Sequence, residues 1–114
     1  MRLYATWAPA LATVLICGVA QAQSYDCSKA ITADEKAVCA SPRLSALDTE
    51  MAQIYEQIEE CALMGTRGDV QDSQRAFMAQ RASCGADDTC LVKLYSDRVA
   101  DLKTIENGVG QGAC

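Results

Sequence analysis

The residues with the clearest chemistry in this sequence are its cysteines. Six of the seven follow an apolar N-terminal segment that contains the seventh, Cys17; the six are Cys27, Cys39, Cys61, Cys84, Cys90 and Cys114. An even set of cysteines in a small chain indicates disulfide bonds formed in an oxidising compartment. A zinc or redox site is the alternative, but no pair has Cys-x-x-Cys spacing and the chain has no histidine. We therefore expect disulfides and no metal site.

Three glutamates are the best candidates for a binding surface. Glu56, Glu59 and Glu60 stand one turn apart near the C-terminal end of an expected helix, where like charges repel and the helix dipole disfavours negative charge. Residues whose placement is locally unfavourable, as here, are often kept for binding or catalysis. A solvated acidic face that aids solubility is the commoner explanation. Arg67, at the tip of an expected turn over residues 65–68, is a further candidate contact.

Arginines and aromatic residues dominate binding hot spots, and six of them invite that interpretation here. Each except Arg75 falls on the apolar stripe of its expected helix, which favours a place in the core instead. The six are Tyr55, Arg75, Phe77, Arg81, Tyr95 and Arg98. Asp48 is expected to cap a helix or to pair with one of the arginines rather than to act as an acid catalyst.

The overall inventory excludes several functions. Ten Lys and Arg stand against fifteen Asp and Glu, which gives a net charge of −5 and argues against nucleic-acid binding. The chain lacks histidine, a recognisable nucleophile setting and a phosphate-cradling glycine loop, so we expect no catalytic residue and no cofactor. Asp87 and Asp88 are paired carboxylates, but adjacent residues rarely face each other across a substrate cleft.

The first 22 residues have the pattern of a cleavable signal peptide. Arg2 precedes an apolar stretch over residues 3–20, and Ala20-Gln21-Ala22 has the small-x-small form read by a signal peptidase. A retained membrane anchor is the alternative, but the stretch is barely long enough and contains Pro9. We expect cleavage before Gln23, which leaves 92 residues with a net charge of −6, exported to the periplasm or the cell exterior and without a membrane span.

Apolar periodicity predicts one short helix and three longer helices within residues 23–106. Thr32 and Glu35 form a capping box that opens a short helix to about residue 40, and Pro42 marks a break. Ser45 with Asp48 is a second capping pair, for a helix that continues to Cys61.

Glycines mark the expected ends of the later helices. Residues 65–68 contain two glycines that should end the helix that starts near Leu44, with Asp69 capping the next helix. Gly85 should end that helix and Asp87 should cap the last one. The tail over residues 107–114 is rich in glycine and should be irregular.

Short connections make consecutive helices antiparallel, and this geometry suggests disulfide pairings among the 15 that six cysteines allow. Cys84 and Cys90 flank one turn, Cys27 and Cys39 tie the mature N-terminus to the short helix, and the tail brings Cys114 back to Cys61. An intermolecular bridge from Cys114 is the alternative for the last pair.

The same residues match a known pattern in order and spacing. They are Cys27, Ala37-Val38-Cys39, Leu44-Ser45-Ala46-Leu47-Asp48, Tyr55, Gln74-Arg75-Ala76-Phe77, Arg81, Cys84, Cys90-Leu91, Tyr95, Arg98 and Leu102. This run resembles the N-terminal domain of the lysozyme-inhibitor LprI family, a small cysteine-containing module of exported bacterial proteins. The chain departs from the family at Phe77, where Trp is usual, in its short 65–68 connection, and in the added Cys61 and Cys114.

The resemblance implies an all-α, disulfide-stapled antiparallel bundle that acts by protein binding. Animal-type lysozymes are basic, so an acidic inhibitor would gain association rate from complementary charge, and salt would weaken the complex. We expect a monomer that binds a basic lysozyme without a cofactor. The alternative is a structural or interaction module of the cell envelope without inhibitory activity; a small-ligand carrier is disfavoured because so short a chain has little interior to spare.

Overall fold

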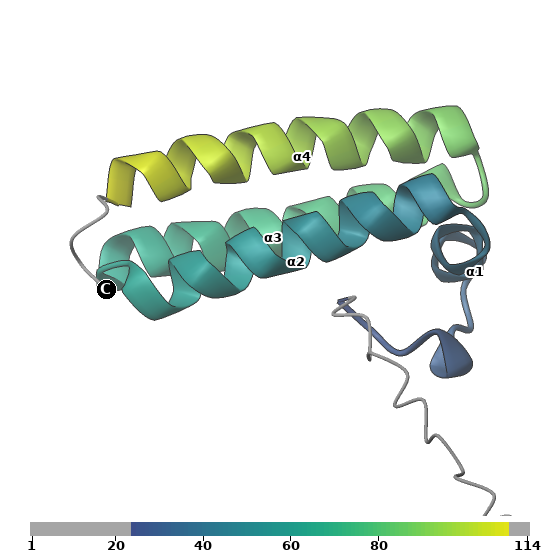
Figure 1. Ribbon diagram of the computed structural model, residues 1–114, viewed down its shortest axis with the longest axis horizontal. Coiled ribbons are helices and arrows are strands. Elements are labelled where there is room, and N and C mark those ends of the chain that lie inside the picture. Colours follow the sequence, from purple (N-terminus) through teal and green to yellow (C-terminus); the bar gives the residue numbers. More distant parts are fainter. Residues whose placement is uncertain (1–23, 110–114) are drawn as a thin grey trace, which may run out of the picture.

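The computed structural model describes residues 24–109, and within that range the ordered elements are all helical. A 3-10 turn, η1 (Cys27–Lys29), precedes α1 (Ala33–Ala40), α2 (Pro42–Cys61), α3 (Met64–Cys84) and α4 (Asp88–Val109). Figure 1 shows α2, α3 and α4 running along one another, with α1 crossing near one end. The prediction of one short and three longer helices in an antiparallel bundle is confirmed.

The chain reverses at each connection between the long helices, so α2 and α4 run in the same direction and α3 runs against both (Figure 1). One end of the bundle, here called the α1 end, holds α1 and the connection from α3 to α4. The opposite end, here called the Leu63 end, holds the connection from α2 to α3 and the last turn of α4. The ends of α2 and α4 therefore lie at the same end, as the antiparallel geometry predicted.

The first two α-helices begin at hydroxyl caps, one of which differs from the prediction. Thr32 caps α1 through its side-chain oxygen, which accepts from the Glu35 backbone N–H. Ser41, rather than Ser45, caps α2 by accepting from the Leu44 backbone N–H at 3.2 Å, with Pro42 at the first helical position. Ser45 instead donates to the Val38 carbonyl at 2.7 Å, so the predicted Ser45 and Asp48 capping pair is wrong.

The glycines at residues 65–68 do not end a helix. α2 ends at Cys61, Ala62 and Leu63 make the connection, and α3 begins at Met64, so both glycines and Asp69 lie inside α3. The glycines have space around them, and nothing lies within 4 Å of a Cβ built on either one. The connection is thus two residues long and contains no glycine, and both glycines lie in the first turns of the next helix.

Gly85 and Asp87 act as predicted at the turn between α3 and α4. Gly85 follows the last residue of α3 with a φ of 56°, in the left-handed region that favours glycine. The Asp87 side chain accepts from the Cys90 backbone N–H at 3.1 Å and so caps α4. α4 continues to Val109, three residues past the predicted end; the remainder of the predicted tail lies outside the described residues.

The core is a single apolar cluster to which every α-helix contributes. Its fully buried members of large volume include Leu44, Met51 and Ile58 from α2 and Leu91, Tyr95 and Leu102 from α4. The Phe77 ring of α3 meets the Tyr95 ring edge to face, with centroids 5.1 Å apart. Because α2 and α4 supply most of the large side chains, their contact forms the centre of the fold.

Two disulfides staple the α1 end. Cys27 is bonded to Cys39, which ties the η1 segment to α1, and Cys84 is bonded to Cys90 across the turn between α3 and α4. Both bridges match the predicted pairings. Cys61, at the C-terminal end of α2, is also disulfide-bonded, while its predicted partner, Cys114, lies outside the described residues, as do the predicted signal peptide and cleavage site.

Candidate functional site

The acidic cluster lies on the last two turns of α2, which lead to the Leu63 end. Glu56 and Glu60 are exposed, and among the described residues neither makes an ion pair or a hydrogen bond. They are four residues apart, so they lie on one side of the helix and their charges add. The structure therefore places two of the three predicted glutamates where a partner could reach them.

Glu59 is the exception, because it takes part in holding α2 to α3. It is half-buried, and its Oε2 accepts from Gln71 Nε2 at 2.9 Å. Burial of Tyr55, together with the nearby Glu59 carboxylate, raises the pKa of the Tyr55 hydroxyl. Glu59 is thus shared between the acidic surface and the contact between the helices.

Arg67 does not stand at the tip of a turn. It lies in the first turn of α3, is half-buried, and donates from Nη2 to the Ala62 carbonyl oxygen at 3.1 Å. This contact satisfies a carbonyl just beyond the end of α2. Arg67 therefore has a structural role at the connection, and the prediction of a tip contact is wrong in its geometry.

The Leu63 end exposes two large apolar side chains that the sequence reading did not single out. Leu63 is 84% exposed and Met64 is 88% exposed, and they follow Glu60 after Cys61 and Ala62 in the chain. Isolated exposed apolar residues are ordinary, but two adjacent ones at a two-residue connection form a small apolar tip. In the sequence, both residues come just after the apolar stripe of α2 ends. They were placed before the expected turn, because the next helix was expected to begin only after the glycines.

A groove between α2 and α3 leads away from the acidic surface. Its volume is about 340 Å³, and its lining residues are Ser24, Met51, Ala52, Tyr55, Glu56, Gln74 and Met78. Two thioethers, an alanine methyl group and a tyrosine side chain make this lining largely apolar. Glu56 is the charged residue of the lining, and Met78 is 39% exposed.

The predicted core arginines and aromatics lie inside the bundle. Arg81 is 3% exposed, Arg98 is 7% exposed, Tyr95 is fully buried and Phe77 is 3% exposed, while Tyr55 is half-buried and Arg75 is exposed. Arg98 donates from Nε to Gln74 Oε1 at 3.0 Å. Because their polar groups are engaged within the fold, these buried residues are part of its interior rather than of a binding surface.

A buried polar network at the α1 end joins residues from every part of the fold. Arg81 Nε donates to Asp34 Oδ2 at 2.7 Å, and Arg81 Nη1 donates to the Tyr95 hydroxyl at 3.3 Å. That hydroxyl in turn donates to Asp48 Oδ1 at 2.8 Å. Asp48 is fully buried and also accepts from the backbone N–H and the hydroxyl of Ser24. Asp48 is therefore neither a helix cap nor a direct partner of an arginine.

The carboxylate of Asp34 stays charged in this network. Its burial works to raise its pKa, but hydrogen bonds from Thr32 and Arg81 and the positive charge of Arg81 outweigh it, so the pKa lies below its usual value. Burial also raises the pKa of Tyr95, and the nearby Asp48 carboxylate adds to the effect. The network holds a charged pair and a neutral tyrosine, and its hydrogen-bonding groups are matched to one another.

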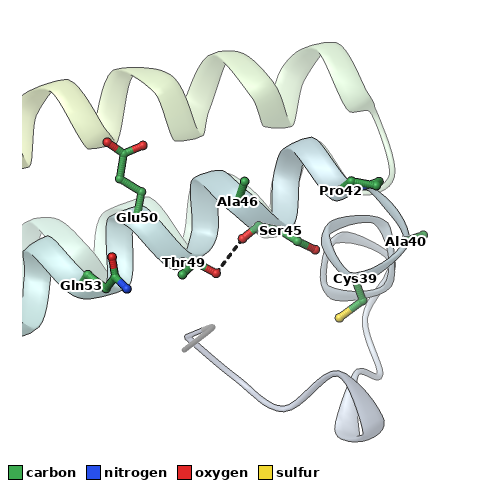
Figure 2. Close-up of a pocket in the computed structure, with 8 residues that line it drawn as sticks. All are labelled: Cys39, Ala40, Pro42, Ser45, Ala46, Thr49, Glu50 and Gln53. Carbon is green, nitrogen blue, oxygen red and sulfur yellow. Dashed lines mark hydrogen bonds between the residues drawn. The ribbon is translucent and has the colours of Figure 1, made fainter. Parts of the chain in front are cut away.

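A second groove, of about 610 Å³, lies beside α1 and the first half of α2 (Figure 2). Its walls carry mainly small residues, and its hydroxyl groups are already used within the fold. Thr49 donates to the Ser45 carbonyl at 2.9 Å, Ser45 donates to Val38, and Glu50 pairs with Lys103 Nζ at 2.6 Å. This groove offers few groups to a ligand.

Asp87 and Asp88 lie at the α1 end, away from the glutamates, and Asp87 is occupied as a cap. Across residues 24–109 no grouping of His, Cys, Asp and Glu side chains suits a metal ion. Within the same range, none of the helices combines the length and apolar character needed to cross a membrane.

Comparisons with protein-family models, curated proteins and solved structures find no match to this chain.

Proposed function

We propose that this chain is an exported protein-binding module that binds a basic protein at its Leu63 end, as a lysozyme inhibitor of the kind its sequence resembles. The observation that carries the proposal is the pairing of exposed Leu63 and Met64 with the unpaired carboxylates of Glu56 and Glu60. An apolar patch with polar groups at its rim is the general anatomy of a protein-binding interface, and methionine is enriched in such patches.

Charge gives this surface a preferred class of partner. The chain after residue 22 carries a net charge of −6, and Glu56 and Glu60 add local negative charge that no described cation neutralises. Complementary fields raise the association rate with a basic protein, and the effect falls as salt shortens the screening length to about 8 Å at physiological ionic strength. Lysozymes of the animal type are basic proteins, and the family that the sequence resembles is one of lysozyme inhibitors.

The test is a titration of oxidised residues 23–114 into a lysozyme assay on bacterial cell walls, at low and at moderate salt. We expect saturable inhibition that weakens as salt rises. Leu63→Ser should reduce inhibition at both salt concentrations, because it removes an apolar anchor. Neutralising two charges with Glu56→Gln and Glu60→Gln should reduce it mainly at low salt.

The matched control removes two charges elsewhere. Asp72→Asn with Asp97→Asn changes the net charge equally and affects only exposed pairs with Arg75 and Lys93. If the control loses as much inhibition as the double glutamate variant, the effect belongs to net charge and not to this surface. An absence of inhibition at large molar excess would contradict the proposal and would favour an envelope module without inhibitory activity.

A further inference from the structure

We infer that the groove between α2 and α3 receives a lysine or arginine side chain of the basic partner; this inference rests on the proposed function and adds the site of one contact. The groove lies next to the acidic surface, because Glu56 belongs to both. A partner seated on the Leu63 end and on Glu60 would therefore extend along α2 to its opening.

The lining suits the stem of a long cationic side chain. Met51 forms part of the buried lining, and Ala52, Tyr55 and Met78 complete the apolar walls. Methionine side chains adapt to the shape of what they contact, and a tyrosine ring attracts a cation placed over its face. Lysine and arginine bury their methylene groups against apolar surface while the charged head remains near water or a counter-charge.

The other polar groups of the lining are engaged within the fold, so one carboxylate is available to the charged head of the partner's lysine or arginine. The Ser24 hydroxyl is bonded to Asp48, and the Gln74 amide is used by Arg98 and by the Met51 sulfur. The Tyr55 hydroxyl interacts with the Glu59 carboxylate. Glu56 is exposed and has no described partner, so it is the group that remains. Arg75, the exposed cation next to Gln74 in the chain, is held by Asp72 on its own helix.

The same features disfavour other occupants. An acidic or phosphorylated side chain would meet the Glu56 carboxylate with no cation in the lining to offset it. A purely apolar side chain would gain from the walls but would cover Glu56 without a counter-charge, which costs desolvation free energy. A cationic side chain contacts the apolar walls through its methylene groups and pairs with the Glu56 carboxylate through its charged head.

Calorimetric titration of a basic animal-type lysozyme with residues 23–114 tests the inference without measuring inhibition. Met78→Lys supplies a cation to the groove from within and should raise the Kd at least ~10-fold, because it competes for Glu56 and repels the incoming charge. Met78→Gln, of similar length and neutral, is the matched control and should change the Kd less than ~3-fold. Both replacements are good helix formers at an exposed position, and circular dichroism confirms that each variant folds.

A second variant tests the carboxylate itself. Glu56→Gln should weaken binding more than Asp97→Asn, which removes the same charge far from the groove on α4. If the wild-type chain binds and Leu63→Ser weakens it, while Met78→Lys behaves like Met78→Gln and Glu56→Gln behaves like Asp97→Asn, the groove is not a contact and the proposed function still stands. If the wild-type chain does not bind lysozyme, the proposed function fails and the groove inference fails with it.

Discussion

Asp34 and Arg81 form an ion pair across 47 residues of sequence, with 5% and 4% of their side chains exposed. Burying two charges has a large desolvation cost, which their attraction and further hydrogen bonds offset only when the geometry is good. Here the Thr32 side chain bonds to Asp34 and the Tyr95 hydroxyl bonds to Arg81. The pair therefore joins α1 to α3 through a buried, fully hydrogen-bonded contact.

Removing one member of that pair should be costly. We expect Asp34→Asn to lower the free energy of unfolding by about 3 kcal/mol, because it leaves the Arg81 guanidinium buried without its counter-charge. Urea denaturation measures the change. The control, Asp72→Asn, breaks an exposed pair and should cost less than about 1 kcal/mol. Equal losses in the two variants would show that the buried pair has no special role.

Tyr25 gives the protein a predictable response to alkali. Burial raises the pKa of its hydroxyl from 10.0 to about 12, with the Asp48, Glu35 and Asp34 charges adding to the shift and Arg81 opposing it. Since the folded state favours the neutral form, the associated stability is full below pH 10 and is lost as pH rises through 12. Denaturation curves between pH 9 and 12 should show this loss, and it should be smaller in Tyr25→Phe. A Tyr25→Phe variant with an unchanged pH profile would contradict this account.

At the scale of secondary-structure elements, the glycines of this chain differ in what they do. Gly85 adopts a φ of 56° at the end of α3, whereas Gly65 and Gly68 lie inside that helix with open space around them. A glycine inside a helix costs about 0.5–1 kcal/mol relative to alanine, and a left-handed glycine is favoured over alanine by a similar amount or more.

The two kinds of glycine should respond to alanine with opposite signs. We expect Gly68→Ala to raise the free energy of unfolding by about 0.5–1 kcal/mol, because it removes backbone freedom from the unfolded chain and meets no neighbour. Gly85→Ala should lower it by about 1–2 kcal/mol. Thermal unfolding of both variants measures the two changes. A stabilising Gly85→Ala would show that the turn does not depend on its left-handed residue.

These glycines also show which helix boundaries could be predicted from the sequence and which could not. Periodic apolar residues located all three long helices, because burial of a stripe is strong and repeats over many turns. A glycine is weaker evidence, since its cost of about 1 kcal/mol is easily outweighed by the packing of Val70 and the residues beyond it on α3. Ser41 and Ser45 could each have capped α2; Ser41 does so, and the Ser45 hydroxyl instead donates to the Val38 carbonyl.

At the scale of the whole molecule, the two ends of the bundle differ. The α1 end holds both described disulfides and the buried polar network, while the Leu63 end carries exposed Leu63 and Met64 beside unpaired glutamates. Cys61 is disulfide-bonded near the Leu63 end as well, so covalent bonds hold both ends. The buried polar network is particular to the α1 end, and the Leu63 end has side chains available for a partner. A small domain with a modest core gains stability from such disulfides, each worth about 2–4 kcal/mol in the loop-entropy model.

The candidate site was partly predictable at this scale. The clustered glutamates follow from the sequence, because their spacing near the end of an apolar stripe is visible there. The connection was predicted at residues 65–68 but lies at Ala62 and Leu63. The exposure of Leu63 and Met64, the inward turn of Arg67 and the groove at Tyr55 depend on where α3 begins and how it packs on α2. The way in which two helices pack on each other cannot be read from the spacing of residues within one helix.

Mapping the contact surface by NMR tests the central claim most directly. Uniformly ¹⁵N-labelled residues 23–114 would be titrated with an unlabelled basic lysozyme, and the amide shifts followed. We predict that the largest changes fall on residues 55–64 and around Met78, and that they diminish as salt is added. Changes confined to the α1 end, around Asp87 and Asp88, or an unchanged spectrum at a large excess of lysozyme, would contradict the account.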